Sequence, residues 1–304
     1  MRWSGVRCMV VLMMAASAFA GCTRPEPWPD LEAEADAAFA SLLAGRGDDG
    51  RWPPAQVPYV IEAAHAAGKD LHAWPQPVPV AHQVAWPPEN ASLLQALRPL
   101  LAVALAAHDG VDVDVAASQR VQDRVMAAFD GRQFGDPALL NDDAFALIVL
   151  GAAHVTWSSA LDPAVDGLLA NQSADGGWSW SVGGAGETDM AGLVLAGVTE
   201  AGAIHRVDRR PVLAFLDTTR SPGGGHALHP GGPPNCDSTV WAIRAHDAFG
   251  MPAPRGDWDF LVSLQRPDGS FAYTPGGPGN ALCTSEAATL LAMAQAHQVV
   301  VPPR

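Results

Sequence analysis

Three segments of sixteen residues resemble one another, without any gap, in the second half of the chain. They cover residues 172–187, 220–235 and 265–280, so their starts lie 48 and 45 residues apart. Each has glycine at its fifth position, an aromatic residue or histidine at its seventh, and a Gly-Gly pair further on. A unit of this size cannot bury its apolar face alone, so the pattern predicts a repeat architecture in which neighbouring units cover one another.

Paired helices are expected around these segments. Four apolar stretches begin with acidic or small polar residues, which open helices, and should be buried on every side. Their starts step by 48, 48 and 47 residues, at Asn141, Asp189, Asp237 and Thr284, and the helices are expected over 141–154, 187–202, 235–250 and 283–296. Amphipathic helices are expected over 160–171, 207–219 and 256–265, and weaker ones over 31–45, 56–68, 90–108 and 113–129. The chain is therefore predicted to be all-α, with about eleven helices in two concentric layers, close to a closed double ring of six and six.

The repeated segments resemble the QW motif of the prenyltransferase/squalene-oxidase repeat family, in which Gln, Gly and an aromatic residue recur. Gln172, Gly176 and Trp178 match it, as do Gln265, Gly269 and Phe271, whereas the middle copy has Arg220 and His226 in place of Gln and the aromatic. The resemblance implies an α/α toroid, the fold of squalene–hopene cyclases, prenyltransferase β subunits, cobalamin carriers and complement thioester domains. It predicts a toroid over residues 56–304, preceded by a tether and a leading helix over 22–55.

The N-terminus is typical of an export signal over residues 1–21. Arg2 and Arg7 precede an apolar run of 13 residues, too short to span a membrane. The run ends in Phe19-Ala20-Gly21-Cys22, which resembles a bacterial lipobox. The resemblance implies a mature protein lipidated at Cys22 and anchored in the cell envelope, at the outer membrane of a two-membrane bacterium because Thr23 follows. The alternative is an ordinary signal peptide cut near Ala20 or Gly21.

The charge balance argues against nucleic acid as a partner. The chain has 18 basic and 32 acidic side chains, a net charge of −14, and loss of Arg2 and Arg7 would leave −16. Proteins that bind nucleic acid present basic patches, because those neutralise phosphates. We expect an envelope ligand or protein as partner, beside the membrane itself, and no cofactor.

The catalytic motifs of the family are missing or altered here. The nearest match to the Asp-x-Asp-Asp acid of the cyclases is Asp112-Val113-Asp114-Val115, which lacks the last Asp and stands at an expected helix start. The zinc ligands of the prenyltransferases have no intact counterpart, and a weak alternative metal site would use His226, His229, Cys236 and Asp237. The Cys-Gly-Glu-Gln thioester sequence follows neither Cys236 nor Cys283.

Polar residues collect at the starts of the apolar helices. Helix capping explains most of them, since Asp and Asn accept free backbone N–H groups there. The alternative is a polar rim for a ligand at one mouth of the ring, formed by Asp142, Glu187, Asp189, Asn235 and Asp237 with walls from Trp178 and Trp241. Asn141, Asp143, Asn280, Thr284 and Glu286 stand at the same starts, and Trp180 and Tyr273 are further wall candidates. A place in the core is the favoured interpretation of these aromatic residues.

Two classes of function remain open from the sequence. The absent motifs favour a lipid-anchored, non-catalytic binding or scaffold module of the envelope. The alternative is an enzyme, either terpenoid-cyclase- or prenyltransferase-like and acting on an isoprenoid, or a glycan-cleaving toroid, whose catalytic residues the sequence does not identify. Cys236 and Cys283 stand near neighbouring helix starts, and we predict a disulfide between them, as oxidising compartments permit.

Overall fold

A computed structural model describes residues 31–108, 114–155 and 157–300, the last four by their backbone alone. The export signal, Cys22, Asp112 and most of the tether lie outside the described residues. Within them the chain forms eleven α-helices, so the prediction of a mostly helical chain with about eleven helices is confirmed. They are α1 Glu32–Ala44, α2 Val57–Ala66, α3 Leu93–His108, α4 Val115–Met126, α5 Asn141–Ala152, α6 Asp162–Ala170, α7 Thr188–Glu200, α8 Arg209–Thr219, α9 Cys236–Ala248, α10 Arg255–Ser263 and α11 Ala281–Val300. Three 3₁₀ turns (Val80–Gln83, Ser159–Leu161, Ile204–Arg206) and two short antiparallel strands, β1 Phe271–Ala272 and β2 Gly279–Asn280, complete them.

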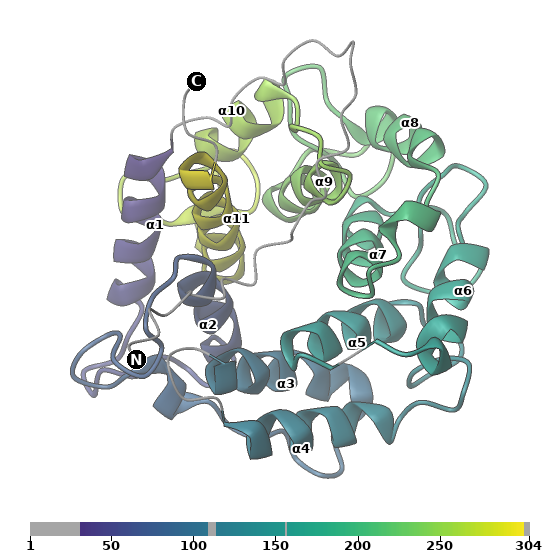
Figure 1. Ribbon diagram of the computed structural model, residues 1–304. Helices are drawn as coiled ribbons and strands as arrows, with labels where there is room; N and C mark the ends of the chain where they lie inside the picture. Colours follow the sequence, from purple (N-terminus) through teal and green to yellow (C-terminus); the bar gives the residue numbers. More distant parts are fainter. Residues whose placement is uncertain (1–30, 109–113, 156, 301–304) are drawn as a thin grey trace.

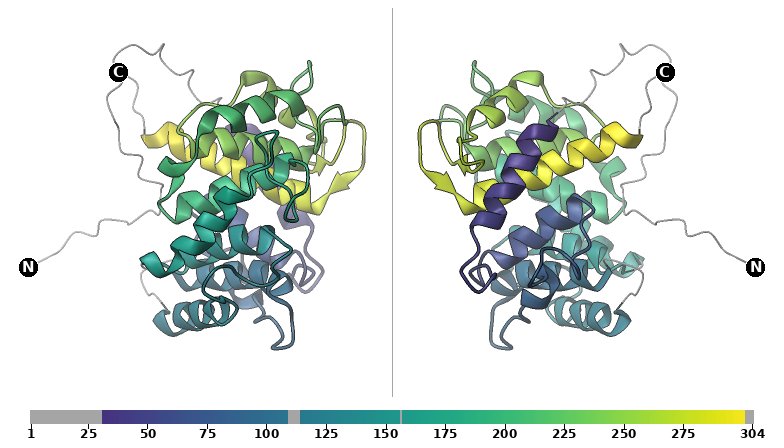
Figure 2. Two further views of the ribbon diagram at one scale, coloured as in Figure 1. Left: turned by 90° about the vertical axis from the view of Figure 1, so that its right-hand side faces the viewer. Right: turned by 90° about the vertical axis from the view of Figure 1, so that its left-hand side faces the viewer.

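Six of the helices form a closed cycle of contacts. Following the chain, α2 packs on α3, α3 on α5, α5 on α7, α7 on α9, α9 on α11, and α11 packs back on α2 (Figure 1). The other five lie against this cycle, with α4 on α3 and α5, α6 on α5, α8 on α7, α10 on α9 and α1 on α11. Figure 2 shows α1 lying across α11. We call the space enclosed by the six cyclic helices the centre of the ring.

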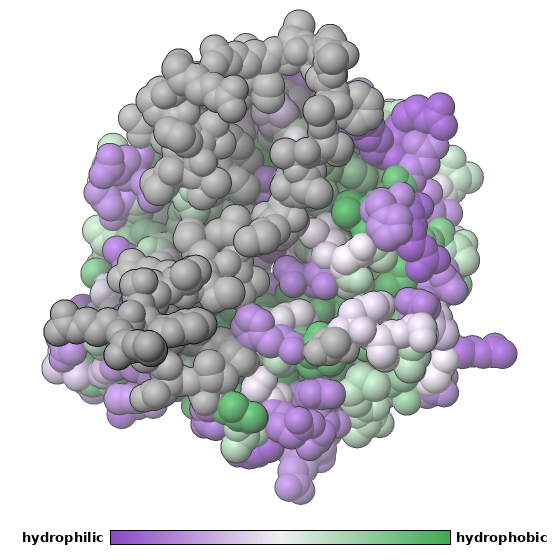
Figure 3. All heavy atoms as spheres, viewed as in Figure 1, coloured by the Kyte–Doolittle hydropathy of each residue, from purple (hydrophilic) through white to green (hydrophobic). Residues whose placement is uncertain are grey.

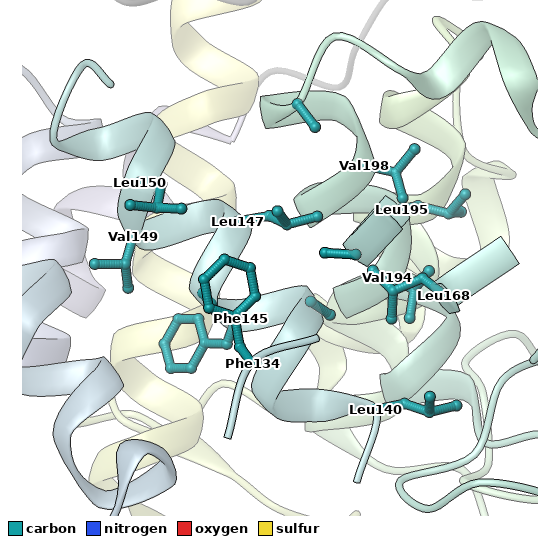
Figure 4. Close-up of a cluster of buried hydrophobic side chains, with 14 of the residues drawn as sticks. Phe134, Leu140, Phe145, Leu147, Val149, Leu150, Leu168, Val194, Leu195 and Val198 are labelled. Atoms are coloured by element: carbon teal, nitrogen blue, oxygen red, sulfur yellow. The ribbon is translucent and has the colours of Figure 1, made fainter. Parts of the chain in front are cut away.

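The cyclic helices pack closely because small residues face their neighbours. On α7, a Cβ at Gly197 would overlap the backbone of Ala144 on α5, and a Cβ at Gly192 would overlap Trp241 on α9. Around these contacts, branched side chains of α5, α6 and α7 form a buried cluster that includes Leu147, Leu168, Val194, Leu195 and Val198 (Figure 4). Each such side chain stabilises the fold by about 1.5–3 kcal/mol relative to its exposed state.

Each repeated loop packs against the outer helix that comes after it. A Cβ at Gly176 would overlap the Pro211 carbonyl of α8, and a Cβ at Gly224 would overlap the Gly256 carbonyl of α10. The buried Trp178 indole donates back to the Leu168 carbonyl of the preceding helix α6 at 2.7 Å. The third loop reaches the N-terminal helix instead, because Gln265 Nε2 donates to the Glu34 carbonyl of α1 at 2.8 Å. Helix α1, which the sequence analysis placed ahead of the toroid, therefore completes the outer layer where the two ends of the ring meet.

The spacing of the last repeat was predicted wrongly. The Thr239 hydroxyl donates to the Asn235 carbonyl and accepts from the His226 N–H, and Thr284 makes the same two bonds with Asn280 and Phe271. Thr284 is therefore the counterpart of Thr239, 45 residues back, and not of Asp237. The same offset makes Glu286 the counterpart of Trp241.

The middle loop replaces the aromatic contact by a buried ionic network. His226 is 1% exposed, and its Nε2 lies 3.2 Å from Oδ2 of Asp257, while its Nδ1 lies 3.1 Å from the Thr219 hydroxyl. Arg220, in the place of the motif glutamine, donates to Oδ1 of Asp257 at 2.8 Å. Burial would raise the pKa of Asp257, but the hydrogen bond and charge of His226, together with Arg220, hold that pKa below its ordinary value.

We therefore expect Asp257 to make stability depend on acid. Because its pKa is lower in the folded chain, its contribution is complete above its unfolded pKa of about 3.9 and is lost as the pH falls through the folded value. In Asp257→Asn, the urea midpoint should be lower at neutral pH and should fall less between about pH 5 and pH 2. The matched control is Asp259→Asn on the same helix, an exposed carboxylate paired with Arg255. Equal acid sensitivity of the Asp257 variant and the native chain would contradict the prediction.

Candidate functional site

Charged side chains of opposite sides of the ring interact across its centre. Glu286 of α11 interacts electrostatically with Arg98 of α3 and Glu62 of α2, and Arg244 of α9 interacts with the same two residues. Helix α9 packs on α7 and α11 within the cycle, so its interactions with Glu62 and Arg98 run across the ring and not along it. The side chains of Glu62 and Arg98 are 17% and 22% exposed, so solvent reaches them. Figure 3 shows hydrophilic side chains near the middle of the face seen in Figure 1.

Three carboxyl groups meet at this centre, one from each of α7, α9 and α11. Asp189 and Glu286 each lie close enough to Asp237 to interact with it electrostatically. Oδ1 of Asp189, Oδ1 of Asp237 and Oε2 of Glu286 are buried and find no N–H or O–H donor among the described residues. Neighbouring carboxylates repel one another, and this repulsion favours protonation of one of them. We call these three residues the acid triad.

Asp189 and Glu286 of the acid triad hold their protons more tightly than exposed carboxyls do. Burial, and then the charge of Asp237, raises the pKa of Asp189 to about 7. Burial and Asp237 also raise the pKa of Glu286 well above its usual range, and the positive charge of Arg98 offsets only part of this. Asn235 supports the arrangement, because its amide donates to the Ser238 hydroxyl at 3.0 Å and Ser238 hydrogen-bonds Asp189. The centre therefore contains carboxylic acids that can donate a proton near pH 7.

This protonation has a cost in stability that can be measured. Because the pKa of Asp189 rises from 3.8 to about 7 on folding, the folded chain binds the proton more tightly, and stability falls as the pH rises through this interval. Asp189→Asn removes the titrating group, so we expect its urea midpoint to fall less than that of the native chain between about pH 4 and pH 7. Asp114→Asn is the control, since Asp114 caps α4 and Asn caps equally well. If the urea midpoint of Asp189→Asn fell with pH as steeply as that of the native chain, the prediction would be contradicted.

Aromatic faces at the centre are covered by arginine. The guanidinium of Arg98 lies 4.1 Å from the ring centroid of Tyr59 and 5.0 Å from that of Phe145, and it pairs with Glu62 at 2.7 Å. Arg244 lies 4.4 Å from the ring of Trp241. No carboxylate of the described chain lies within ion-pair distance of Arg244, and burial lowers its pKa. The centre thus offers a guanidinium, held by stacking, to a polar group of a ligand.

The structure separates the candidate residues of the sequence analysis into two groups. Asp189, Asp237 and Trp241 lie at the centre, together with Glu286. The others hold loops and helix starts: Asp142 accepts from the Asp136 N–H, Glu187 accepts from the Ser179 hydroxyl, Asn235 caps α9 by accepting from the Ser238 N–H, and Trp178 is core.

Sequence reasoning missed Tyr59, Glu62, Arg98 and Arg244. A signal was present for the arginines, because each interrupts an apolar helix (Leu-Arg-Pro-Leu and Ile-Arg-Ala-His), where an unpaired charge is costly.

The alternative metal site and the disulfide are not formed in this structure. His226 bonds Asp257, and His229 Nδ1 lies 3.1 Å from the Gly186 carbonyl, so neither faces Cys236 and Asp237. The described residues contain no group of three His, Cys, Asp or Glu side chains arranged to hold a metal. Cys236 and Cys283 are adjacent, buried free thiols, and the Cys236 Sγ points at the Cys283 carbonyl at 3.8 Å.

A pocket of about 360 Å³ lies between the start of α5 and α6, away from the acid triad. Asp143 lines this pocket, and burial raises its pKa to about 7. None of the helices in the described part of the chain is both long and apolar enough to cross a membrane.

Solved structures share this fold at low sequence identity. A protein from Actinoplanes aligns with a TM-score of 0.59 and 15% identity over 88% of this chain and 100% of its own. An apo variant of a type II terpene cyclase from Scytonema aligns with a TM-score of 0.57 and 14% identity, over 88% of this chain and 97% of its own. A polysaccharide lyase aligns with a TM-score of 0.54 and 11% identity, over 90% of this chain and 100% of its own. No family model and no curated protein matches the sequence. At such identities the likeness concerns the fold alone, and it confirms a helical fold of the toroid-like class.

Proposed function

We propose that this chain is an α/α toroid of the QW-repeat type whose acid triad cleaves glycosidic bonds in a glycan of the cell envelope. The observation that carries the proposal is the contact of Asp189 and Glu286 with Asp237 at the centre of the ring. The altered family motifs favoured a non-catalytic module in the sequence analysis. The acid triad supports the catalytic alternative, because three carboxyls converge there and burial raises the pKa values of two of them, Asp189 and Glu286, which exceeds what helix capping needs.

The lining of the centre favours a polar substrate over an isoprenoid. The π-faces of Tyr59, Phe145 and Trp241 carry guanidinium groups, so they are not free to stabilise a carbocation. An apolar polyene would also cover Glu62, Arg98 and Arg244 without offering them hydrogen bonds, and that desolvation is unfavourable. A sugar offers hydroxyl groups to all three. The likeness to a polysaccharide lyase agrees with a glycan as substrate.

Hydrolysis of a glycosidic bond requires one proton donor and one negative charge, and the acid triad can supply both. A protonated carboxyl, Asp189 or Glu286, donates its proton to the glycosidic oxygen as the bond from that oxygen to the anomeric carbon breaks. The remaining carboxylate charge stabilises the positive charge that develops on the sugar ring. Water then adds to the anomeric carbon and returns its proton to the triad, which restores the starting state.

The test uses the full chain, solubilised in detergent. We expect new reducing ends when it is incubated with purified peptidoglycan or with capsular polysaccharide, and no change in geranylgeranyl substrates followed by mass spectrometry. Cyclised isoprenoid would instead indicate a terpenoid cyclase. A glycan that is bound but not cleaved would indicate the binding module that the sequence analysis favoured.

The lipid anchor is a second part of the proposal. The sequence Phe19-Ala20-Gly21-Cys22 supports acylation of Cys22, which would place the ring beside an envelope membrane, where glycans are at hand. Mass spectrometry of the membrane fraction should find acylated Cys22, and Cys22→Ser should release the protein. Unmodified protein in the soluble fraction of native cells would contradict the anchor and leave the catalytic proposal standing.

A further inference from the structure

Three side chains occupy equivalent places at one end of the ring. The N–H of Leu140, at the start of α5, donates to the Trp180 carbonyl at 2.9 Å. The N–H of Thr188, at the start of α7, donates to the Leu228 carbonyl at 3.0 Å. The N–H of Cys236, at the start of α9, donates to the Tyr273 carbonyl at 2.9 Å. Trp180, Leu228 and Tyr273 lie 48 and 45 residues apart, the spacing of the loops themselves. Because the same backbone hydrogen bond holds each of them against a helix start, we call Trp180, Leu228 and Tyr273 the mouth arc.

The mouth arc is unusually exposed for its composition. Trp180 and Tyr273 are each 45% exposed, and Leu228 is half-buried. The strongly exposed large hydrophobic residues of the described chain are five, and four of them (Trp180, Val182, Tyr273 and Leu282) belong to these loops or to the start of α11. Scattered apolar residues need no explanation, but their concentration at one end of a ring marks a binding surface.

The mouth arc is continuous with the acid triad. Tyr273 interacts electrostatically with Asp237 and Asp189, and these carboxylates, after burial, raise its pKa. Tyr273 is therefore near enough to two carboxyls of the acid triad for their charges to affect it. The exposed rim and the acid triad thus belong to the same end of the ring.

We infer that the mouth arc is a saccharide-binding platform, on which Trp180 and Tyr273 stack against sugar rings of a glycan chain that crosses the mouth. This inference rests on the proposed function and names how its substrate is held. Sugar rings have apolar C–H faces and polar edges, and amphipathic aromatic side chains suit both. A membrane is the competing occupant, but the chain has a net charge of −14, which repels anionic lipids.

Binding to oligosaccharides tests the inference. The detergent-solubilised chain is applied to an array of immobilised bacterial envelope oligosaccharides, and the affinity for the best-bound one is measured by calorimetry. Trp180→Ala and Tyr273→Ala should each weaken that affinity about tenfold, because each removes one stacking surface. Tyr273→Phe should retain it. The matched control is Val115→Ala on α4, which removes an apolar side chain that is 69% exposed away from the mouth.

The results separate this inference from the proposed catalysis. Glu286→Gln should bind the oligosaccharide as the native chain does while cleaving it at least about a hundredfold more slowly. Arc-dependent binding without turnover in the native chain would sink the catalytic proposal and support the platform. Native affinity in Trp180→Ala, absence of any bound oligosaccharide, or arc-dependent binding to phosphatidylglycerol vesicles alone would each overturn the platform.

Discussion

Glu286→Gln should reduce the rate of glycan cleavage by about a hundredfold to ten-thousandfold, the contribution of one general acid. Glutamine keeps the size of the side chain but cannot donate a proton as a carboxylic acid does. Asp189→Asn and Asp237→Asn should reduce the cleavage rate by a similar factor, since each removes a carboxyl that interacts with the other two. Substrate affinity should change much less than the rate, because in this proposal the mouth arc, and not the acid triad, binds the glycan.

The control for this series is Asp208→Asn. Asp208 is an exposed carboxylate that caps the outer helix α8, so its change should leave the rate unaltered. The native rate should also fall as the pH rises above about 7, where Asp189 loses its proton. Full activity in Glu286→Gln together with Asp189→Asn would remove the acid triad from the mechanism.

The second large effect is expected at the glycine of the third loop. Gly269 has a φ of +81°, and a Cβ there would overlap the carbonyl oxygen of Ala37 on α1. Gly269→Ala combines a left-handed backbone, which costs an L-residue about 1–2 kcal/mol, with a clash that costs about 1–3 kcal/mol more. We expect the free energy of unfolding to fall by about 2–5 kcal/mol, measured by urea denaturation, because the contact closes the ring between its two ends.

The same loop supplies a matched control. Gly276 has a φ of +74°, but a Cβ there would meet nothing within 4 Å. Gly276→Ala therefore carries the backbone cost alone, about 1–2 kcal/mol. Equal losses in the two variants would show that α1 does not press on Gly269 in solution and that the ring is open there.

Local features of the sequence determined the helices and their order. Gly and Pro clusters end helices because they cannot continue the hydrogen-bond pattern, and polar residues start them by capping. The expected helix over 141–154 is α5 Asn141–Ala152, and that over 207–219 is α8 Arg209–Thr219. The same local chemistry separated buried from half-buried helices, and with them the two layers.

The register of the last repeat was decided by contacts between loops and helices. By position along the chain, Thr284 seemed to follow Asp237 after 47 residues, since both open apolar helices. The hydrogen bonds of Thr239 and Thr284 with their loops fix the step at 45 instead. The step is shorter because the stretch from the start of α9 to the third loop, 236–264, is shorter than the corresponding stretch 188–219. This shift brings Glu286, not a cap, to the place of Trp241.

Only the closed ring decided which residues meet at its centre. Tyr59 and Glu286 are 227 residues apart, and their interaction exists because α11 packs back on α2. The acid triad takes one carboxyl from each of three helices, so no motif of neighbouring residues announces it. The raised pKa values of Asp189 and Glu286 arise from burial and mutual proximity, which are properties of the folded chain and not of any segment of the sequence.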